Sequence, residues 1–240
     1  MFLESAAIHR HTFPDEQAYP FCLEVLQQTQ TLSFNQPVTI FSGENGTGKS
    51  TLLEALAIRC GIHIWQPEHY LRCEANPHEK NLYRHLSVTW SQGPVPGSYF
   101  GSQIFSHFAR KLEEWAVNDR PMLDYFGGKS LITQSHGQSL MSYFASRYRR
   151  KGVYFLDEPE TALSPRSLVD LLNLIVKESG KGHAQFVIAT HSPILMACPD
   201  AVIYGFDGPK ILPVRYEDTD YYRLYKAFMA DPGAFIGVEN

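Results

Sequence analysis

The chain has 240 residues, enough for one large domain or for a domain that carries a substantial insertion. Hydrophobic residues make up 44% of it and charged residues 19%, which suits a folded core and excludes a disordered chain. The net charge of −4 argues against a strongly basic nucleic-acid-binding domain, and no apolar run approaches the roughly 18 residues that suggest a membrane span. Because the N-terminus also lacks the long apolar stretch of a secretion signal, we expect a cytoplasmic protein.

Apolar runs of strand length alternate along the chain with stretches of helical periodicity. Buried strands are predicted at residues 38–41, 153–156 and 186–189, and strands near a sheet edge at residues 202–204 and 211–214. Helices are predicted over residues 50–60, 104–117, 137–149, 166–179 and 219–230, while residues 61–101 are irregular. This order predicts an α/β fold with a mainly parallel sheet flanked by helices, in a single domain over residues 1–240. Residues 62–148 are predicted to form an inserted, mostly helical lobe.

The four cysteines form no CxxC pair, which favours free thiols over a disulfide framework. Several thiols and imidazoles follow the first predicted helix closely in sequence: Cys60, His63, His69, Cys73 and His78. Their spacing matches no standard zinc pattern, so a helix end and loop is the favoured interpretation over a metal site.

The most specific motif is a glycine-rich loop between a predicted strand and a predicted helix, Gly43-Glu44-Asn45-Gly46-Thr47-Gly48-Lys49-Ser50. It fits GxxxxGK[ST], and its position between strand and helix is the context that this phosphate-binding motif requires. Glycines allow the backbone to approach phosphates, and the loop amides and the helix start attract negative charge. We expect Lys49 to contact the β and γ phosphates, Ser50 to bind Mg²⁺, and Thr51 to join the nucleotide-binding residues.

Two further predicted strands end in polar side chains of catalytic type. Asp157 and Glu158 follow the strand at residues 153–156, at the end where ligands of parallel sheets bind. Asp157 is predicted to hold Mg²⁺, and Glu158 to polarise the attacking water as a base. His191 follows the strand at residues 186–189 and is predicted to contact the γ-phosphate.

A fourth segment, residues 134–139, precedes a predicted helix. Its Ser135 and Gly137 suit anion binding at a helix N-terminus, although a helix cap without a ligand is the alternative interpretation.

Taken in order, these motifs resemble those of the ABC-type ATPase superfamily, from Walker A at residues 43–50 to the histidine switch at His191. The segments at residues 156–165 and 189–193 resemble stand-alone AAA-type ATPases related to the SMC, RecF and OLD groups. Transporter subunits are less similar, since His136 stands where they usually carry glycine and Ser164 where aspartate is frequent.

The resemblance implies a head-to-tail homodimer that holds two ATP molecules between its subunits. Ser135 and Gly137 of one subunit would contact the ATP that is bound by the other subunit. A glutamine at the start of the lobe would link Mg²⁺ to the lobe, and Gln103 is favoured over Gln92 for this role.

An aromatic side chain near the N-terminus would stack on adenine. Phe13, Tyr19 and Phe21 all compete for this position.

These motifs predict an ATPase that converts ATP and water to ADP and phosphate and acts as a dimerisation switch, in DNA repair or phage defence. Its output would pass to DNA or to an effector protein. The basic stripe from Arg147 to Lys151 suits either a phosphate backbone or a solvated helix end.

The alternative function is a transporter's nucleotide-binding subunit, but the proline-rich residues 67–97 do not resemble a usual coupling surface, so a membrane partner is disfavoured. The third interpretation is a non-hydrolysing nucleotide sensor. It is disfavoured because such a protein could dispense with Glu158.

Overall fold

The computed structural model describes residues 1–64, 76–101 and 136–236. A six-stranded sheet forms its centre, and all neighbouring strands in it are parallel except the edge pair β8–β9. Across this sheet the strands are β5 (Gly97–Gly101), β6 (Gly152–Asp157), β7 (Ala184–Ala189), β3 (Val38–Ser42), β8 (Val202–Gly205) and β9 (Leu212–Val214). This confirms the predicted α/β fold with a mainly parallel sheet.

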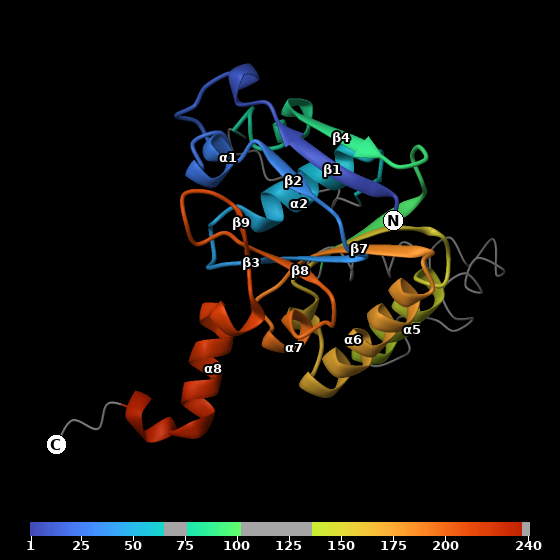
Figure 1. The fold of residues 1–240 in the computed structure, drawn as a ribbon, viewed down its shortest axis with the longest axis vertical. Helices are drawn as coiled ribbons and strands as arrows, with labels where there is room; N and C mark the ends of the chain where they lie inside the picture. The colour runs from blue at the N-terminus through green and yellow to red at the C-terminus, as the bar shows by residue number, and fades with distance from the viewer. Residues whose placement is uncertain (65–75, 102–135, 237–240) are drawn as a thin grey trace.

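A second, antiparallel sheet lies above the first (Figure 1). Its strands, in spatial order, are β2 (Thr31–Ser33), β1 (Leu3–Ile8) and β4 (Leu86–Trp90). The helices are α1 (Glu24–Gln28), α2 (Lys49–Arg59), α5 (His136–Arg147), α6 (Pro165–Gly180), α7 (Pro193–Met196) and α8 (Asp220–Ala230). Short 3-10 helices cover Arg10–Thr12, Leu82–His85, Pro159–Ala162, Tyr216–Asp218 and Pro232–Phe235. None of the helices within the described ranges is long and apolar enough to cross a membrane.

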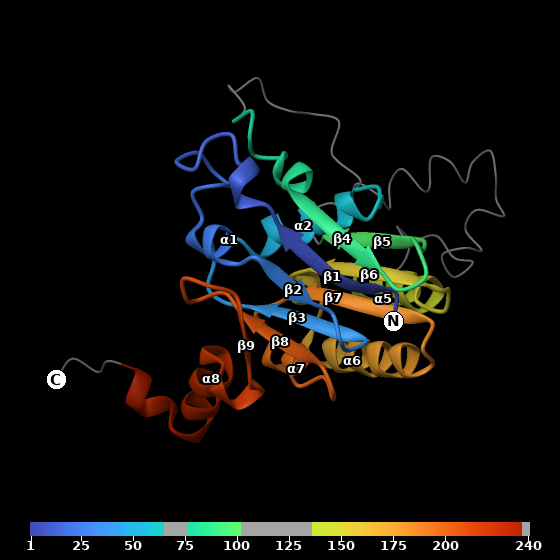
Figure 2. The same ribbon diagram turned by 45° about the horizontal axis from the view of Figure 1, so that its top comes forward.

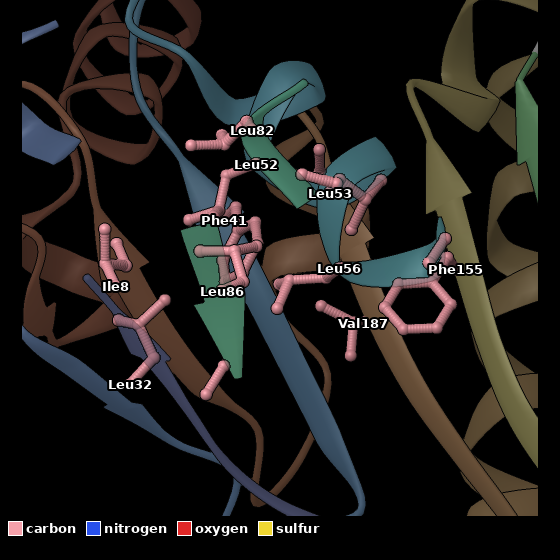
Figure 3. Packing of buried hydrophobic residues seen from close by; sticks show 14 of the residues in the cluster. Ile8, Leu32, Phe41, Leu52, Leu53, Leu56, Leu82, Leu86, Phe155 and Val187 are labelled. Atoms are coloured by element: carbon pink, nitrogen blue, oxygen red, sulfur yellow. The ribbon is translucent and has the colours of Figure 1, made fainter. Parts of the chain in front are cut away.

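The central strands β3, β6 and β7 are buried on both faces, which is why they are almost continuously apolar. Helix α2 lies between the two sheets, while α5, α6 and α7 cover the opposite face (Figures 1 and 2). Successive side chains of β7 accordingly alternate between two clusters: Val187 packs with α2, and Phe186 and Ile188 pack with α5 and α6. Figure 3 shows the first cluster, with apolar side chains from α2, both sheets and the Leu82 turn: Ile8, Leu32, Phe41, Leu52, Leu53, Leu56, Leu82, Leu86, Phe155 and Val187.

Two strands lie in the stretch that is irregular in sequence, residues 61–101. Strand β4 pairs with β1, and β5 forms the edge of the large sheet beside β6. Glycines begin and end β5. At Gly97 the backbones come very close, since a Cβ there would lie 2.1 Å from the carbonyl oxygen of Val153. The predicted helix at residues 104–117 lies outside the described residues, and the inserted lobe at residues 62–148 stays a prediction.

A buried glutamine joins the two sheets. The Oε1 atom of Gln185 in β7 accepts hydrogen bonds from the amides of Phe2 and Leu3, both at 2.9 Å, and its Nε2 donates to the Leu3 carbonyl, also at 2.9 Å. These three hydrogen bonds link the start of the N-terminal strand to the large sheet. The side chain therefore fixes where the N-terminal strand lies against β7.

We expect Gln185→Leu to lower the free energy of unfolding by about 2–4 kcal/mol, because it leaves these buried backbone groups without partners. Urea titration followed by circular dichroism measures the change. Gln17→Leu, at an exposed position, is the matched control and should stay within about 0.5 kcal/mol of the wild type. Equal stability of the two variants would contradict a structural role for Gln185.

Candidate nucleotide-binding site

Three of the four predicted motifs meet at one edge of the large sheet. Strands β6, β7 and β3 are neighbours, and Ala189 of β7 pairs with Asp157 on one side and with Phe41 on the other. Because the three strands are parallel, the segments that follow them emerge at the same edge, where ligands of such sheets bind.

The glycine-rich loop joins β3 to α2, and three of its glycines have positive φ: Gly43 at 151°, Gly46 at 81° and Gly48 at 98°. At Gly43 a Cβ would lie 2.9 Å from both the Asp207 carboxylate and the Phe206 Cβ, so only glycine fits. The Asp207 carboxylate also accepts a hydrogen bond from the Glu44 amide at 2.7 Å. Asp207, which follows β8, therefore fixes one side of the loop, and no motif pointed to it.

The Lys49 ammonium is almost completely buried, with 4% of the residue exposed. Its Nζ donates to the loop carbonyls of Gly43 at 2.6 Å and Glu44 at 2.7 Å. Burial lowers the pKa of Lys49, while the nearby carboxylates of Glu158, Asp207, Asp157 and Glu44 act to raise it. A buried cation beside the amides that begin α2 is an arrangement that suits phosphate.

Asp157 lies across from the loop and accepts two hydrogen bonds from hydroxyl groups. Ser50 Oγ donates to its Oδ1 at 2.8 Å, and the Tyr99 hydroxyl of β5 donates to its Oδ2 at 3.0 Å. Burial raises the pKa of Asp157 to about 6, although these two hydrogen bonds act to lower it. The hydroxyl and carboxylate oxygens of Ser50 and Asp157 are the hard ligands that fit Mg²⁺ together with phosphate and water.

Glu158 has an uncommon backbone conformation, with φ 44° and ψ 54°. This left-handed conformation costs a non-glycine residue about 1–3 kcal/mol. It is held by the Glu158 amide, which donates to the Ala189 carbonyl at 2.9 Å, and by the Thr161 hydroxyl, which donates to the Glu158 carbonyl at 2.8 Å. The turn after β6, rather than strand alternation, therefore sets the direction of the Glu158 side chain.

His191 is held by contacts on three sides. Its Nε2 lies 3.2 Å from Glu158 Oε1, its Nδ1 is hydrogen-bonded to the Tyr221 hydroxyl, and its amide donates to Glu160 Oε1 at 2.5 Å. Glu160 Oε1 also accepts from the Thr190 hydroxyl at 2.8 Å. Sequence reasoning missed Glu160 and Tyr221. Glu160 lies only two residues after Glu158, whereas Tyr221 is 30 residues beyond His191 and carries no local signal.

Other predicted site residues lie apart from this centre or outside the described residues. Gln103 and Ser135 fall in the part of the chain that is not described. Gly137 lies in the first turn of α5, beside Ser167 of α6, on the sheet face opposite to α2.

Gln92, the alternative to Gln103, precedes β5 and lies at the far end of the sheet. Its neighbour Ser91 donates from its amide to the Phe2 carbonyl at 2.8 Å, and the Lys151 ammonium before β6 lies 5.2 Å from the centre of the Phe2 ring. In contrast, β5 ends at Gly101, which pairs with Asp157. Chain order therefore continues to favour Gln103 over Gln92.

The three candidate aromatics differ in exposure. Phe21 is fully buried, with its ring centre 4.7 Å from that of Phe13. Tyr19 is 40% exposed, and its hydroxyl is 2.5 Å from the Thr51 hydroxyl at the start of α2. A pocket of about 120 Å³ opens here, lined by Tyr19, Ser50, Thr51, Glu54, Ala55, Ile58, Glu79, Lys80 and Leu82. Tyr19 is therefore the most exposed of the three, since Phe13 is partly buried.

The structure describes three of the five thiols and imidazoles that follow the first predicted helix, namely Cys60, His63 and His78. No three His, Cys, Asp or Glu side chains converge there as a metal site, while His69 and Cys73 lie outside the described ranges. Burial raises the pKa of Cys60 to about 12, which keeps this thiol protonated.

Comparisons with known proteins match the two halves of the site separately. A family model described as "AAA domain" matches residues 21–61, and one described as "AAA domain, putative AbiEii toxin, Type IV TA system" matches residues 135–197. The bacitracin export ATP-binding protein BceA of Halalkalibacterium halodurans is 31% identical over 162 residues, which cover 68% of this chain and 59% of that protein. The chain thus spans about three fifths of the length of this relative.

Solved structures of similar fold come from two groups. The cbiO1 structure from Clostridium perfringens, part of the ABC transporter complex cbiONQ, is 18% identical with a TM-score of 0.48, covering 84% of this chain and 87% of that chain. The SMC head domain from Thermotoga maritima is 14% identical with a TM-score of 0.44, covering 90% of this chain and 100% of that chain.

We expect Asp157→Asn to stabilise the nucleotide-free protein above neutral pH. The pKa of Asp157 is raised from 3.8 to about 6 by burial, so between these values the unfolded chain loses a proton that the folded chain keeps. Stability therefore falls as the pH rises through this window, and about two pKa units correspond to about 3 kcal/mol. An amide avoids this cost, so the gain should be about 1–3 kcal/mol at about pH 8 and smaller at about pH 4.5.

Urea titrations of the wild type and the variant at both pH values measure this difference. Asp170→Asn, at an exposed position of α6, is the matched control and should show no such pH-dependent gain. A gain of equal size at both pH values would contradict the burial of a proton on Asp157.

Proposed function

We propose that the chain is a P-loop ATPase domain of the ABC type, which binds ATP with Mg²⁺ and hydrolyses it to ADP and phosphate. The observation that carries this proposal is the 2.8 Å hydrogen bond from Ser50 to Asp157, which joins the phosphate loop to the end of β6. It joins residues 107 positions apart, one from each of the two segments that nucleotide hydrolysis needs.

Each group has a task in this reaction. Lys49 and the loop amides hold the phosphates, with Gly43, Gly46 and Gly48 allowing the backbone to approach. Ser50 and Asp157 would hold Mg²⁺, which, when bound, neutralises charge on the β and γ phosphates.

Glu158 orients the attacking water and accepts its proton, and His191 lies beside it at the end of β7. The strained backbone of Glu158 keeps the carboxylate at this edge of the sheet instead of continuing the strand. Tyr19, next to Thr51, offers an exposed ring on the side of the nucleoside.

The proposed active unit is a head-to-tail dimer. Gly137 and α5 lie on the face of the sheet opposite to α2, so they are poorly placed to reach the phosphate loop of their own subunit. A second copy could bring Ser135 and Gly137 to that loop. ATP binding would then close the dimer, and hydrolysis would open it.

The switch would act on an effector protein or on DNA, in cellular defence or DNA repair. The description of the family matched at residues 135–197, which names a toxin of a type IV TA system, supports defence. The basic stripe supports DNA less well, because two of its members have structural tasks. Arg147 donates to the Gly97 carbonyl at 2.7 Å, and Lys151 lies over the Phe2 ring.

The alternative function is the nucleotide-binding subunit of a transporter, and the similarity to an export ATP-binding protein favours it. The two functions differ in their partner. Co-purification with a multi-span membrane protein from solubilised membranes would support the transporter, and ATP-driven self-association of the isolated chain would support the switch.

We expect Glu158→Gln to slow hydrolysis at least about a hundredfold, because it removes the base but keeps the shape of the side chain. The variant should still bind ATP and should accumulate as a dimer in saturating ATP and Mg²⁺, as measured by light scattering. Glu4→Gln, at an exposed position of β1, is the matched control and should hydrolyse ATP like the wild type. A Glu158→Gln protein that stays monomeric under these conditions would rule out the dimer switch.

We expect Lys49→Ala to abolish measurable ATP binding at concentrations that saturate the wild type, because it removes the buried ammonium from the loop. Isothermal calorimetry with ATP and Mg²⁺ measures the affinity. Lys177→Ala, at an exposed position of α6, should bind ATP normally. An unchanged affinity of Lys49→Ala would refute the proposed phosphate site itself.

A further inference from the structure

The C-terminal helix α8 supplies a side chain to the catalytic edge of the sheet. Tyr221, in the first turn of α8, places its hydroxyl against Nδ1 of His191, and the two ring centres are 5.1 Å apart at an interplanar angle of 69°. The other ring nitrogen of the same histidine lies 3.2 Å from the Glu158 carboxylate. One imidazole therefore connects α8 to the group that is proposed to activate water.

These two contacts determine where the neutral imidazole carries its proton. A carboxylate accepts hydrogen bonds, so the contact with Glu158 favours a proton on Nε2, and a donor at Nδ1 strengthens that preference. The remaining nitrogen, Nδ1, is then an acceptor, and the Tyr221 hydroxyl donates to it. The opposite tautomer would place the Nε2 lone pair against a carboxylate, which is unfavourable.

The phenol is a dependable donor at this position. Burial raises the pKa of Tyr221 to about 12. Nearby carboxylates contribute to the same shift: Glu44, Asp207, Glu158 and Glu160. The hydroxyl therefore keeps its proton at neutral and mildly alkaline pH. Without the hydroxyl, only the Glu158 contact at Nε2 would favour one tautomer over the other.

The start of α8 is anchored to the segment that carries His191. Thr219 caps the helix by accepting from the Tyr222 amide at 3.3 Å, and it donates to the Tyr216 carbonyl at 2.7 Å. The Tyr216 hydroxyl in turn donates to the carbonyl of Pro193, two residues after His191, at 3.0 Å. These bonds hold the Tyr221 ring in register with the imidazole, although the rest of α8 extends away from the sheets (Figures 1 and 2).

We propose that Tyr221 is a positioning residue for ATP hydrolysis, which holds His191 as its Nε2–H tautomer with that N–H directed at Glu158. This inference rests on the proposed function. The neutral ring then offers a hydrogen-bond donor on the side of the reaction, and the Glu158 carboxylate is oriented by it. Loss of the hydroxyl should reduce turnover and leave ATP binding, which depends on Lys49 and the loop, nearly unchanged.

The test compares Tyr221→Phe, which removes only the hydroxyl, with the wild type. The first readout is the long-range proton–nitrogen NMR spectrum of the full chain labelled with ¹⁵N-histidine, without nucleotide, at about pH 8, where an ordinary imidazole is neutral. The His191 signals are identified by their loss in His191→Gln. We expect the wild type to show the Nε2–H tautomer and Tyr221→Phe to show a mixture that includes the Nδ1–H tautomer.

The second readout is steady-state hydrolysis of ATP with Mg²⁺. We expect kcat of Tyr221→Phe to fall about tenfold, the loss typical of one hydrogen bond, and KM to stay within about twofold. Tyr222→Phe is the matched control, since its hydroxyl contacts Lys226 at 3.3 Å rather than the histidine. It should leave both the His191 spectrum and kcat unchanged.

Two results would overturn the proposal. An unchanged His191 tautomer in Tyr221→Phe would show that the hydroxyl does not set the proton position. A changed tautomer with an unchanged kcat would show that hydrolysis does not depend on it. If the wild type hydrolyses no ATP at all, the proposed function fails, and the NMR comparison still decides whether Tyr221 sets the tautomer.

Discussion

The parallel pairing of β6, β7 and β3 brings together side chains that are far apart in the chain. Asp157 and Ala189 are register partners, and Ala189 also pairs with Phe41, so three strand ends lie side by side. Apolar packing on both faces enforces this pairing, because a shift of one residue would exchange the two sets of side chains between α2 and α6. The position of every proposed catalytic group follows from that register.

The same burial that fixes the register places charges where they are costly. Desolvation lowers the pKa of Lys49 and raises that of Asp157, so each is shifted toward its neutral form in the nucleotide-free protein. The left-handed backbone of Glu158 adds strain at the same edge of the sheet. Phosphate and Mg²⁺ would relieve the first two costs by supplying the opposite charges. The proposed site is thus least stable in the nucleotide-free protein.

The sequence predicted the parts of the site that follow apolar strands. Asp157 and His191 could be found because each closely follows a run of strand length, and parallel strands share an edge. Lys49 could be found because the glycine-rich motif around it stands between a strand and a helix. Strand β5 could not be found, because two glycines and neighbouring prolines hide a strand whose backbone must approach Val153 closely.

Asp207 and Tyr221 were missed for a different reason. Each meets the site through the tertiary fold, Asp207 from the loop after β8 and Tyr221 from α8, and neither stands in a local pattern. Gln185 is a similar case, because a glutamine in an apolar strand becomes meaningful only when β1 is placed against it. The roles of Gln103 and Ser135 stay predictions from motif order.

The proposed site includes residues that lie beyond its sequence motifs. Both matched family segments end by residue 197, before the carboxylate that fixes the glycine loop and before the phenol that faces the imidazole. A chain cut after β9 would keep every motif and the entire parallel sheet, yet its histidine would face solvent where a hydroxyl now stands. Two proteins with identical motifs can therefore differ in turnover through a tail that no motif describes. In this chain, the C-terminal helix belongs to the proposed active site.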